Sequence, residues 1–361
     1  MRMKPVRAGI VGCGYWGSKH LRVFNELPDC EVAALCETSE INVARQPRAF
    51  LPERVTASYE DFLNSPVEAV VIATPAATHY QLALEALSRD KHVLVEKPFT
   101  TRTEEAVHLI RLAESKGLTL MVGHTYVYHP AVAFIRDLVQ SGELGPLYYI
   151  HAARLNFGLL QPDVDVMWDL APHDLSILLH ILDQEPVAVA ARGTAHVNPN
   201  LVEVAHLDIE FLNSLLAHIY VSWMEPTKVR RLTLVGGDKT VVFDDTSDIQ
   251  MISVHNQGIQ LHDARDGRRD FSPQYLRGDV NIPFLANSEA LKVQAAHFLH
   301  CLRTGQRPLS DGSEGLKIVR ILESAEKSLR KSGFLELLSP IVLMGHDAKI
   351  DVPPIQLRAS V

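Results

Sequence analysis

A glycine-rich loop near the N-terminus constrains the fold of this chain more than any other feature. Gly12, Gly14 and Gly17 follow an apolar run over residues 6–11 and open a segment with helical periodicity. In that context the first glycine permits a tight turn, the second lets a ligand approach the backbone, and the third lets helix and strand pack closely. The order of strand, glycine loop and helix predicts the first unit of a doubly wound parallel sheet.

Short apolar runs and helical patterns alternate through the first 124 residues, which predicts a parallel sheet with right-handed crossover helices. We expect strands at residues 6–11, 32–36, 69–73, 92–95 and 119–122, a short strand near Val55, and helices at 16–27, 78–89 and 103–116. Thr103 is expected to be the N-cap of the last helix, with Glu105 in its first turn.

The pattern changes after Pro130. The predicted elements there are helices at 131–140 and 169–182, strands at 147–155, 187–195, 204–211, 215–223, 230–235 and 239–243, and closing helices at 288–303 and 313–332. We therefore predict an α/β fold with an N-terminal Rossmann dinucleotide-binding domain at 1–124. A second α/β domain at 125–337, with a large and mostly antiparallel open sheet, and a tail at 338–361 follow it.

Composition and charge restrict the class of protein. With 361 residues, of which 47% are hydrophobic and 22% charged, the chain can bury a large core and is long enough for two domains. The formal net charge of −8 argues against a nucleic acid partner. The cysteines lack metal or redox spacing, and no apolar run approaches the about 20 residues that cross a bilayer. We expect a cytoplasmic protein without membrane contact.

The glycine loop also indicates a cofactor. The N-terminus of the helix that it opens would face the pyrophosphate of a dinucleotide, and Tyr15 and Trp16 lie within the loop. Glu37 follows the second strand, where an acidic side chain binds the ribose hydroxyls and repels a 2′-phosphate. The sequence therefore favours NAD over NADP, with Arg45 and Arg48 left open as contacts of the adenosine.

Two further segments lie where the nicotinamide end of the cofactor is expected. The fourth and fifth predicted strands run into the candidate cofactor contacts Thr74, Pro75, His79, Glu96 and Lys97. Both segments are candidates because ligands of an open parallel sheet bind outside the carboxyl ends of its strands. Pro98 restricts Lys97 to an extended backbone, which keeps the amine out of the next helix and suits a catalytic role.

These motifs resemble the Gfo/Idh/MocA oxidoreductases, and the resemblance extends from Gly9 to about Leu329. It is carried by the glycine loop, Ala73-Thr74-Pro75-x-x-x-His79, Glu96-Lys97-Pro98, Trp168-Asp169-x-x-x-His173-Asp174, and the C-terminal segments 296–305 and 311–315. The resemblance implies a Rossmann domain, a second domain whose open sheet makes subunit contacts in a homodimer or homotetramer, and a substrate between cofactor and sheet.

Asp169 and His173 are four residues apart, so on a helix they share one face. Oxidation of a carbinol needs a base for the hydroxyl proton, and histidine titrates in the suitable range. The resemblance implies that Lys97 and His173 form the catalytic pair, with His173 as general base, Lys97 as proton relay or oxyanion donor, and Asp169 as orienter. Lys97 as the base remains open, and a metal site is disfavoured because no further ligand has a matching spacing.

The segment after the sixth strand departs from the family pattern, since Thr125 and Val127 replace the usual polar residues of an Asn-x-Arg-Phe-like phrase. This aromatic-rich variant is similar to members that act on nucleotide-linked sugars. The predicted substrate residues are Lys97, Tyr126, Arg154, Asn156, Trp168, Asp169 and His173, with Arg230 and Arg231 as candidates for a diphosphate.

The sequence therefore predicts an NAD-dependent oxidoreductase that removes hydride from a secondary hydroxyl of a sugar, with a UDP-type hexose as the expected substrate. One alternative is a dehydrogenase of free sugars or inositol, including a cofactor-recycling oxidoreductase. Another is a non-catalytic NAD-binding sensor. The presence of Lys97, Asp169 and His173 together argues against the sensor.

Overall fold

The computed structural model describes residues 4–158, 160–161, 163–261, 273–286 and 288–338. Its N-terminal half is a six-stranded parallel sheet in the order β3-β2-β1-β4-β5-β6. The strands are β1 (Val6–Val11), β2 (Cys30–Cys36), β3 (Arg54–Thr56), β4 (Ala69–Ile72), β5 (His92–Val95) and β6 (Leu120–Val122). The central strands are short runs of buried apolar residues, which is typical of a sheet covered on both faces.

Helices connect these strands as crossovers. They are α1 (Tyr15–Glu26), α2 (Glu40–Ala44), η1 (Arg48–Phe50), α3 (Tyr59–Leu63), η2 (Ala76–Thr78), α4 (His79–Ser88) and α5 (Thr103–Lys116). The predicted N-cap at Thr103 is wrong. Arg102 is the N-cap of α5, and the Thr103 hydroxyl hydrogen-bonds Glu323 instead, because a tertiary partner is available.

The second half contains a nine-stranded sheet in the order β16-β13-β12-β11-β7-β10-β9-β8-β17, and a separate β14-β15 pair. Its strands are β7 (Leu147–Phe157), β8 (Ala188–Thr194), β9 (Val204–Glu210), β10 (Leu216–Ser222), β11 (Met224–Gly236), β12 (Thr240–Asp244), β13 (Ile252–His255), β14 (Gly258–Leu261), β15 (Pro273–Leu276), β16 (Val280–Asn281) and β17 (Glu336–Leu337). β7 and β10 pair in parallel, and the other described pairs are antiparallel.

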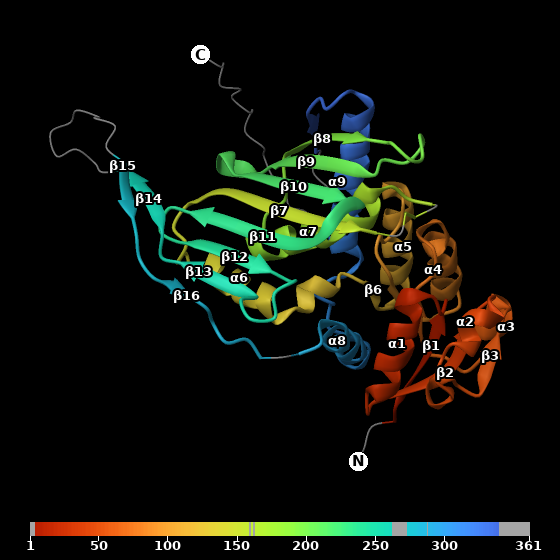
Figure 1. Ribbon diagram of the computed structural model, residues 1–361. Helices are drawn as coiled ribbons and strands as arrows, with labels where there is room; N and C mark the ends of the chain where they lie inside the picture. The colour runs from red at the N-terminus through yellow and green to blue at the C-terminus, as the bar shows by residue number, and fades with distance from the viewer. Residues whose placement is uncertain (1–3, 159, 162, 262–272, 287, 339–361) are drawn as a thin grey trace.

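Helices cover one face of this large sheet and leave the other face open (Figure 1). The helical segments of this half are η3 (Thr125–Tyr128), α6 (Pro130–Gln140), α7 (Val166–Leu182), η4 (Leu212–Ser214), α8 (Ala290–Thr304) and α9 (Gly312–Arg330). α7 packs on β9 and β10, and α9 packs on β8 and on α5 of the parallel sheet. Part of the predicted tail, residues 339–361, lies outside the described residues.

One hydrophobic core extends through both halves. A single cluster of buried side chains contains residues of β4, β5, α5, α7, α9 and the large sheet. A second cluster packs α8 against α1 and the parallel sheet, with Phe298 and Leu299 beside Phe24. α8 was predicted as part of the second domain, yet it buries its apolar face on the first, because periodicity shows which face is apolar and not what covers it.

The outer strand β6 is joined by residues from the far end of the chain. The Val122 N–H donates to the Ser310 backbone oxygen at 2.7 Å, and the Ser310 hydroxyl donates to the Val122 oxygen at 2.7 Å. Met121 and Asp311 form an antiparallel bridge beside these bonds. The chain that leads into α9 therefore satisfies part of the free edge of β6. No helix within the described ranges combines the length and the apolar character of a membrane span.

Candidate active site

The glycine loop forms a cradle that requires small residues. Gly12 has a φ of 84°, and a Cβ atom there would lie 2.6 Å from the Ala73 backbone oxygen. A Cβ at Gly17 would lie 2.0 Å from the Gly12 oxygen, so α1 can approach the loop only with glycine at this position. At Gly14 a Cβ would meet no protein atom within 4 Å. The backbone at Gly14 therefore faces open space, as the approach of a pyrophosphate requires.

The N-terminus of α1 and the end of β2 complete this cradle. Gly14 is the N-cap of α1 and supplies no side-chain hydrogen bond, so the first N–H groups of the helix are available to an anion. Glu37 lies against the loop, because its carboxylate accepts hydrogen bonds from the backbone N of Cys13 at 2.6 Å and of Ser39 at 2.8 Å. These residues fit a dinucleotide with its pyrophosphate on α1 and a ribose beside Glu37.

His79 ties together the loops that follow β4 and β5. Its ring is buried, with Nδ1 2.7 Å from the Pro98 backbone oxygen and Nε2 3.0 Å from the Thr74 oxygen. Burial lowers the pKa of His79. Pro75 is exposed beside Thr74 at the rim of the cleft. His79 thus links the two loops through their backbone oxygens, and its buried ring does not face the cleft.

Glu96 has a similar supporting position under Lys97. Its carboxylate is buried, lies 2.8 Å from Nε2 of His20, and accepts a hydrogen bond from the Lys97 backbone N at 3.1 Å. The peptide bond between Lys97 and Pro98 is cis. Burial alone would raise the pKa of Glu96, but His20 and Lys97 lower it overall, so the carboxylate is ionised. Glu96 therefore fixes the backbone from which the Lys97 side chain extends.

Asp169 holds the amine of Lys97. Nζ of Lys97 donates to carboxylate Oδ1 at 2.8 Å and to the backbone oxygen of the same residue at 2.7 Å. The second carboxylate oxygen accepts a hydrogen bond from indole Nε1 of Trp223 at 3.1 Å. The Lys97 side chain is only 8% exposed. The structure thus brings Lys97 from the parallel sheet to Asp169 on α7 and fixes the direction of its ammonium group.

His173 lies one turn after Asp169 on α7. Its ring makes an edge contact with Tyr126, with centroids 5.4 Å apart and an interplanar angle of 72°. Nδ1 is buried and has no hydrogen-bond partner among the described residues. Burial lowers the pKa of His173 well below its ordinary value, and the positive charges of Lys97 and Arg154 lower it further. The imidazole is therefore neutral near neutral pH and can accept a proton.

A buried hydrogen-bond network fixes Tyr126 beside His173. Arg154 on β7 forms a bidentate pair with Asp174, with both N–O distances 2.9 Å, and donates to the Tyr126 hydroxyl at 3.1 Å. The Tyr126 hydroxyl donates to Asp245 at 2.6 Å, and Arg230 donates to the same carboxylate oxygen at 3.1 Å. Burial raises the pKa of Tyr126, so the phenol stays protonated. The guanidinium of Arg154 therefore braces Tyr126 and α7.

Other predicted substrate residues differ in their placement. Trp168 is 7% exposed and packs within the hydrophobic core, so we leave it out of the proposed site. Asn156 is half-buried, and its Oδ1 atom has no partner among the described residues. Arg230 lies opposite Arg154 in the β7-β11 register, whereas Arg231 faces the open side of the sheet near His151. The expectation that both arginines reach one ligand is therefore wrong, because successive strand residues point to opposite faces.

Lys19, Lys228 and Arg230, named here the basic rim, are the cations whose charges act on Tyr15. Tyr15 is 72% exposed, and the Lys19 amine lies 4.0 Å from the centroid of its ring. The same amine lies 4.6 Å from the Trp16 ring. A hydrogen bond to Lys19 lowers the pKa of Tyr15, and the charges of Arg230 and Lys228 lower it further.

The sequence pattern did not identify Trp223, Asp245, Lys19 or Lys228. Trp223 precedes β11 and Asp245 follows β12, and both reach the site through the pairing of these strands in the large sheet. No local sequence motif predicts contacts of this kind. The cations had a weak signal, since Lys19 follows the glycine loop directly. Within the described ranges, no cluster of three or more His, Cys, Asp or Glu side chains could hold a metal ion.

Two family models match the chain. The model described as an oxidoreductase family with an NAD-binding Rossmann fold matches residues 6–124. The model described as a GFO/IDH/MocA C-terminal domain matches residues 132–242. The two models thus match the parallel sheet and most of the strands of the large sheet.

Among known proteins, UDP-N-acetylglucosamine 3-dehydrogenase of Acidithiobacillus ferrooxidans is 29% identical over 88% of this chain and 95% of its own length. Its structure has a TM-score of 0.75 at 26% identity and covers 91% of this chain and 99% of that one. The scyllo-inositol 2-dehydrogenase (NAD⁺) of Bacillus subtilis is 23% identical over 84% of this chain and 88% of its own length. The WlbA dehydrogenase from Bordetella pertussis, solved with NADH and UDP-GlcNAcA, shares the fold, with a TM-score of 0.74 at 19% identity over 94% of this chain and 100% of that one.

Proposed function

Because the chain belongs to the GFO/IDH/MocA oxidoreductase family and has an NAD-binding Rossmann domain, we propose that it removes hydride from a secondary hydroxyl of a nucleotide-linked, UDP-type hexose. The observation that carries this proposal is the placement of Lys97, Asp169 and His173 at the carboxyl edge of the parallel sheet. The Lys97 amine is fixed by Asp169 at 2.8 Å, and His173 lies one helical turn further on α7.

The three side chains have distinct roles in this proposal. His173 is neutral and accepts the proton of the substrate hydroxyl, while the Lys97 ammonium donates a hydrogen bond to the same oxygen and stabilises its developing negative charge. Asp169 orients Lys97 and is itself held by Trp223. When bound, NAD would supply the hydride acceptor, and Gly14 and Glu37 would hold it. Proton transfer of this kind contributes about 10²- to 10⁴-fold to the rate.

The basic rim favours a nucleotide-linked sugar over a free polyol. Lys19 lies against the ring of Tyr15 in the glycine loop, and the positive charges of Lys228 and of Arg230, which is paired with Asp245, also act on this ring. A free polyol carries no charge that this rim would bind, whereas the diphosphate of a UDP-sugar does. The UDP-N-acetylglucosamine 3-dehydrogenase that resembles this chain acts, by its name, on such a substrate.

Two other functions remain alternatives. The inositol dehydrogenase among the relatives keeps oxidation of free sugars or inositol, with or without release of NADH, as the second candidate. A non-catalytic sensor is less well supported, because it has no need of an amine held between two oxygens of Asp169.

The substrate class can be tested by following NADH at 340 nm with purified protein, NAD⁺ and panels of UDP-hexoses and free polyols. We expect turnover with a UDP-hexose. Lys228→Ala should raise KM for the nucleotide sugar about tenfold and leave KM for NAD⁺ unchanged. Lys116→Ala is the matched control, because it removes a surface lysine of α5 that is paired with Asp90. Turnover of polyols alone would overturn the nucleotide-sugar assignment.

We also infer a homodimer or homotetramer, in the cytoplasm, that forms through the open face of the large sheet. Tyr149 and Leu216 are paired neighbours on β7 and β10 and are 49% and 40% exposed on this face. His151 and His218 form the next pair, with stacked rings 5.6 Å apart. Sedimentation should give an oligomer for the natural chain and a smaller species for Leu216→Asp. A monomeric natural chain would exclude this interface.

A further inference from the structure

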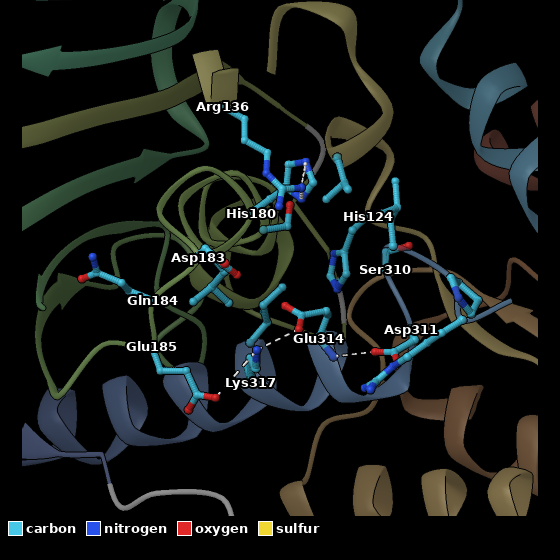
Figure 2. A pocket seen from close by; sticks show the side chains of 17 residues that line it. His124, Arg136, His180, Asp183, Gln184, Glu185, Ser310, Asp311, Glu314 and Lys317 are labelled. Carbon is cyan, nitrogen blue, oxygen red and sulfur yellow. Dashed lines mark hydrogen bonds and ion pairs between the residues drawn. The ribbon is translucent and has the colours of Figure 1, made fainter. Parts of the chain in front are cut away.

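A polar pocket of about 400 Å³ lies between α6, α7 and the N-terminal turns of α9 (Figure 2). Its rim is exposed at Asp183, Gln184, Glu185, Arg307 and Leu309. Its buried lining contains the polar residues His124, Ser176, Ser310 and Asp311 and the apolar residues Val127, Leu179 and Ile318. The pocket therefore leads from solvent into the interior, and it is polar and large enough to hold about a dozen waters.

One face of α7 connects the catalytic cleft with this pocket. Asp169 and His173 face the cleft, and Ser176 and His180, at helical spacing along the same face, line the pocket. The Ser176 hydroxyl donates to the His173 backbone oxygen at 2.7 Å. The catalytic imidazole and the pocket are thus separated by about one helical turn.

His124 lies between the pocket and the catalytic groups. Its side chain is 1% exposed, and neither ring nitrogen has a hydrogen-bond partner among the described residues. Figure 2 shows its ring projecting into the pocket, with Arg136 and His180 on the facing wall. The neighbouring Gly123 packs closely on Glu96. A Cβ atom at Gly123 would lie only 3.0 Å from the carboxyl carbon of Glu96.

Charge effects place His124 near the active site as well. Burial lowers the pKa of His124 to about 4, Glu96 opposes this shift, and Lys97 adds to it. In turn, His124 contributes to the low pKa of His173. Buried polar atoms without partners are rare in folded proteins, so the unpartnered Nδ1 of His173 and the two unpartnered ring nitrogens of His124 need an explanation.

We propose that His124 and this pocket form the proton exit of the enzyme. The inference rests on the proposed function. As the carbinol C–H pair leaves as hydride to NAD⁺, the O–H bond breaks and its proton moves to His173. His173 then passes a proton, directly or through one water, to one nitrogen of His124, and the other nitrogen of His124 releases a proton to water in the pocket. His124 acts through His173 and does not touch the sugar.

The surroundings of the pocket suit this role. A sugar bound over Lys97 and His173 covers the cleft side, whereas the pocket side stays open to solvent. The ionisable groups around His124 and the pocket are Glu96, Lys97, His173, Arg136, His180, Asp183, Glu185, Arg307, Asp311, Glu314 and Lys317. The carboxylates among them give a released proton acceptors on its way to the rim. A neutral imidazole that binds a proton weakly also passes it on rapidly.

The test compares NADH formation with proton release in the full-length protein, using stopped-flow absorbance at 340 nm and a pH indicator in weak buffer. In the natural enzyme both signals should rise together. In His124→Gln the first turnover should still form NADH, whereas proton release and kcat fall at least tenfold, and added imidazole should restore part of kcat. A glutamine amide keeps polarity in the pocket but carries no proton.

His180→Gln is the matched control, because it makes the same substitution in the same pocket away from Lys97. It should keep the natural kcat and show no response to imidazole. Natural kcat with simultaneous proton release in His124→Gln overturns the exit, and so does slow NADH formation that imidazole does not rescue.

A second variant covers the case in which His124→Gln does not fold. Leu309→Trp at the exposed rim narrows the pocket and should slow proton release and kcat without slowing NADH formation in the first turnover, and an unchanged release would again overturn the exit. If none of the tested sugars supports reduction of NAD⁺ by the natural enzyme, both the proposed function and the proposed proton exit are wrong. If the natural enzyme turns over a sugar and neither variant changes kcat or proton release, the proposed function stands and only the proton exit is wrong.

Discussion

Asp169 uses both of its carboxylate oxygens in the folded chain, one for the Lys97 amine and one for the Trp223 indole. This arrangement leaves the ammonium few orientations, since two of its three N–H groups are held by the carboxylate and the backbone oxygen of Asp169, and one is left for a substrate oxygen. His173 has no such partner at Nδ1. In the proposed mechanism this contrast gives Lys97 the fixed charge and His173 the mobile proton.

Lys97→Ala and His173→Ala should each lower kcat by about 10²- to 10⁴-fold, because each removes a group that handles the hydroxyl proton or its charge. NADH binding, measured by fluorescence titration, should stay within about twofold of the natural protein, since Gly14 and Glu37 hold the cofactor. Lys116→Ala should change neither quantity. Full kcat in either active-site variant on the true substrate would remove that residue from the mechanism.

The sequence could propose these residues because their signals are local. A strand end placed Lys97, and helical spacing placed Asp169 beside His173. Trp223 and Asp245 were missed because each reaches the site from a strand whose partner is far away in sequence. Arg154 was predicted as a substrate contact, yet the unforeseen pair with Asp174 and the bond to Tyr126 occupy it.

At the scale of elements, the junction of β1 and α1 contains two glycines that are required for different reasons. The Gly17 position is closed by the Gly12 backbone, and the Gly14 position is open. The φ of Gly14 is −71°, which any residue can adopt. Folding therefore depends on Gly17, whereas cofactor approach depends on Gly14.

Gly14→Ala should keep the melting temperature within about 1 °C and weaken NADH binding at least tenfold, because the new methyl group enters only the space of the pyrophosphate. Gly17→Ala should lower the melting temperature by several degrees, since its Cβ would clash with the Gly12 oxygen at 2.0 Å. Thermal melts and fluorescence titrations of both variants measure this. Equal effects of the two substitutions on stability would contradict the assignment.

The elements of the parallel sheet matched their predicted positions closely, since buried strands of this kind are continuous apolar runs. The second half was harder. β11 begins at Met224 and not at residue 230, because its first residues are largely polar and the register with β7 shifts between Met224 and Val229. β13 to β16 were not predicted, since these strands are only two to four residues long.

At the scale of the whole molecule, the two halves share one core, and buried histidines lie where they meet. Burial lowers the pKa of His124 and of His180 to about 4, and that of His173 well below its ordinary value. In the unfolded chain these groups return to about 6.5. The folded state therefore binds fewer protons than the unfolded state between these limits.

The melting temperature should accordingly fall as the pH is lowered from about 6.5 towards 4. In this range the histidines bind protons in the unfolded chain but stay neutral in the folded chain. Differential scanning fluorimetry between pH 7 and 4.5 measures the decline. His180→Gln should flatten it, since one depressed histidine is lost. Carboxylates with lowered pKa act below about 4.5, so a flat curve between pH 7 and 5 would contradict this account.

Closure of the β6 edge by Ser310 and Asp311 has a consequence for biosynthesis. These residues leave the ribosome long after β6 itself, and α8, which covers α1, leaves almost as late. A nascent chain that ends before residue 290 therefore exposes both an unpaired strand edge and an apolar helix flank. We therefore expect residues 1–124, expressed by themselves, to aggregate more readily than the full chain.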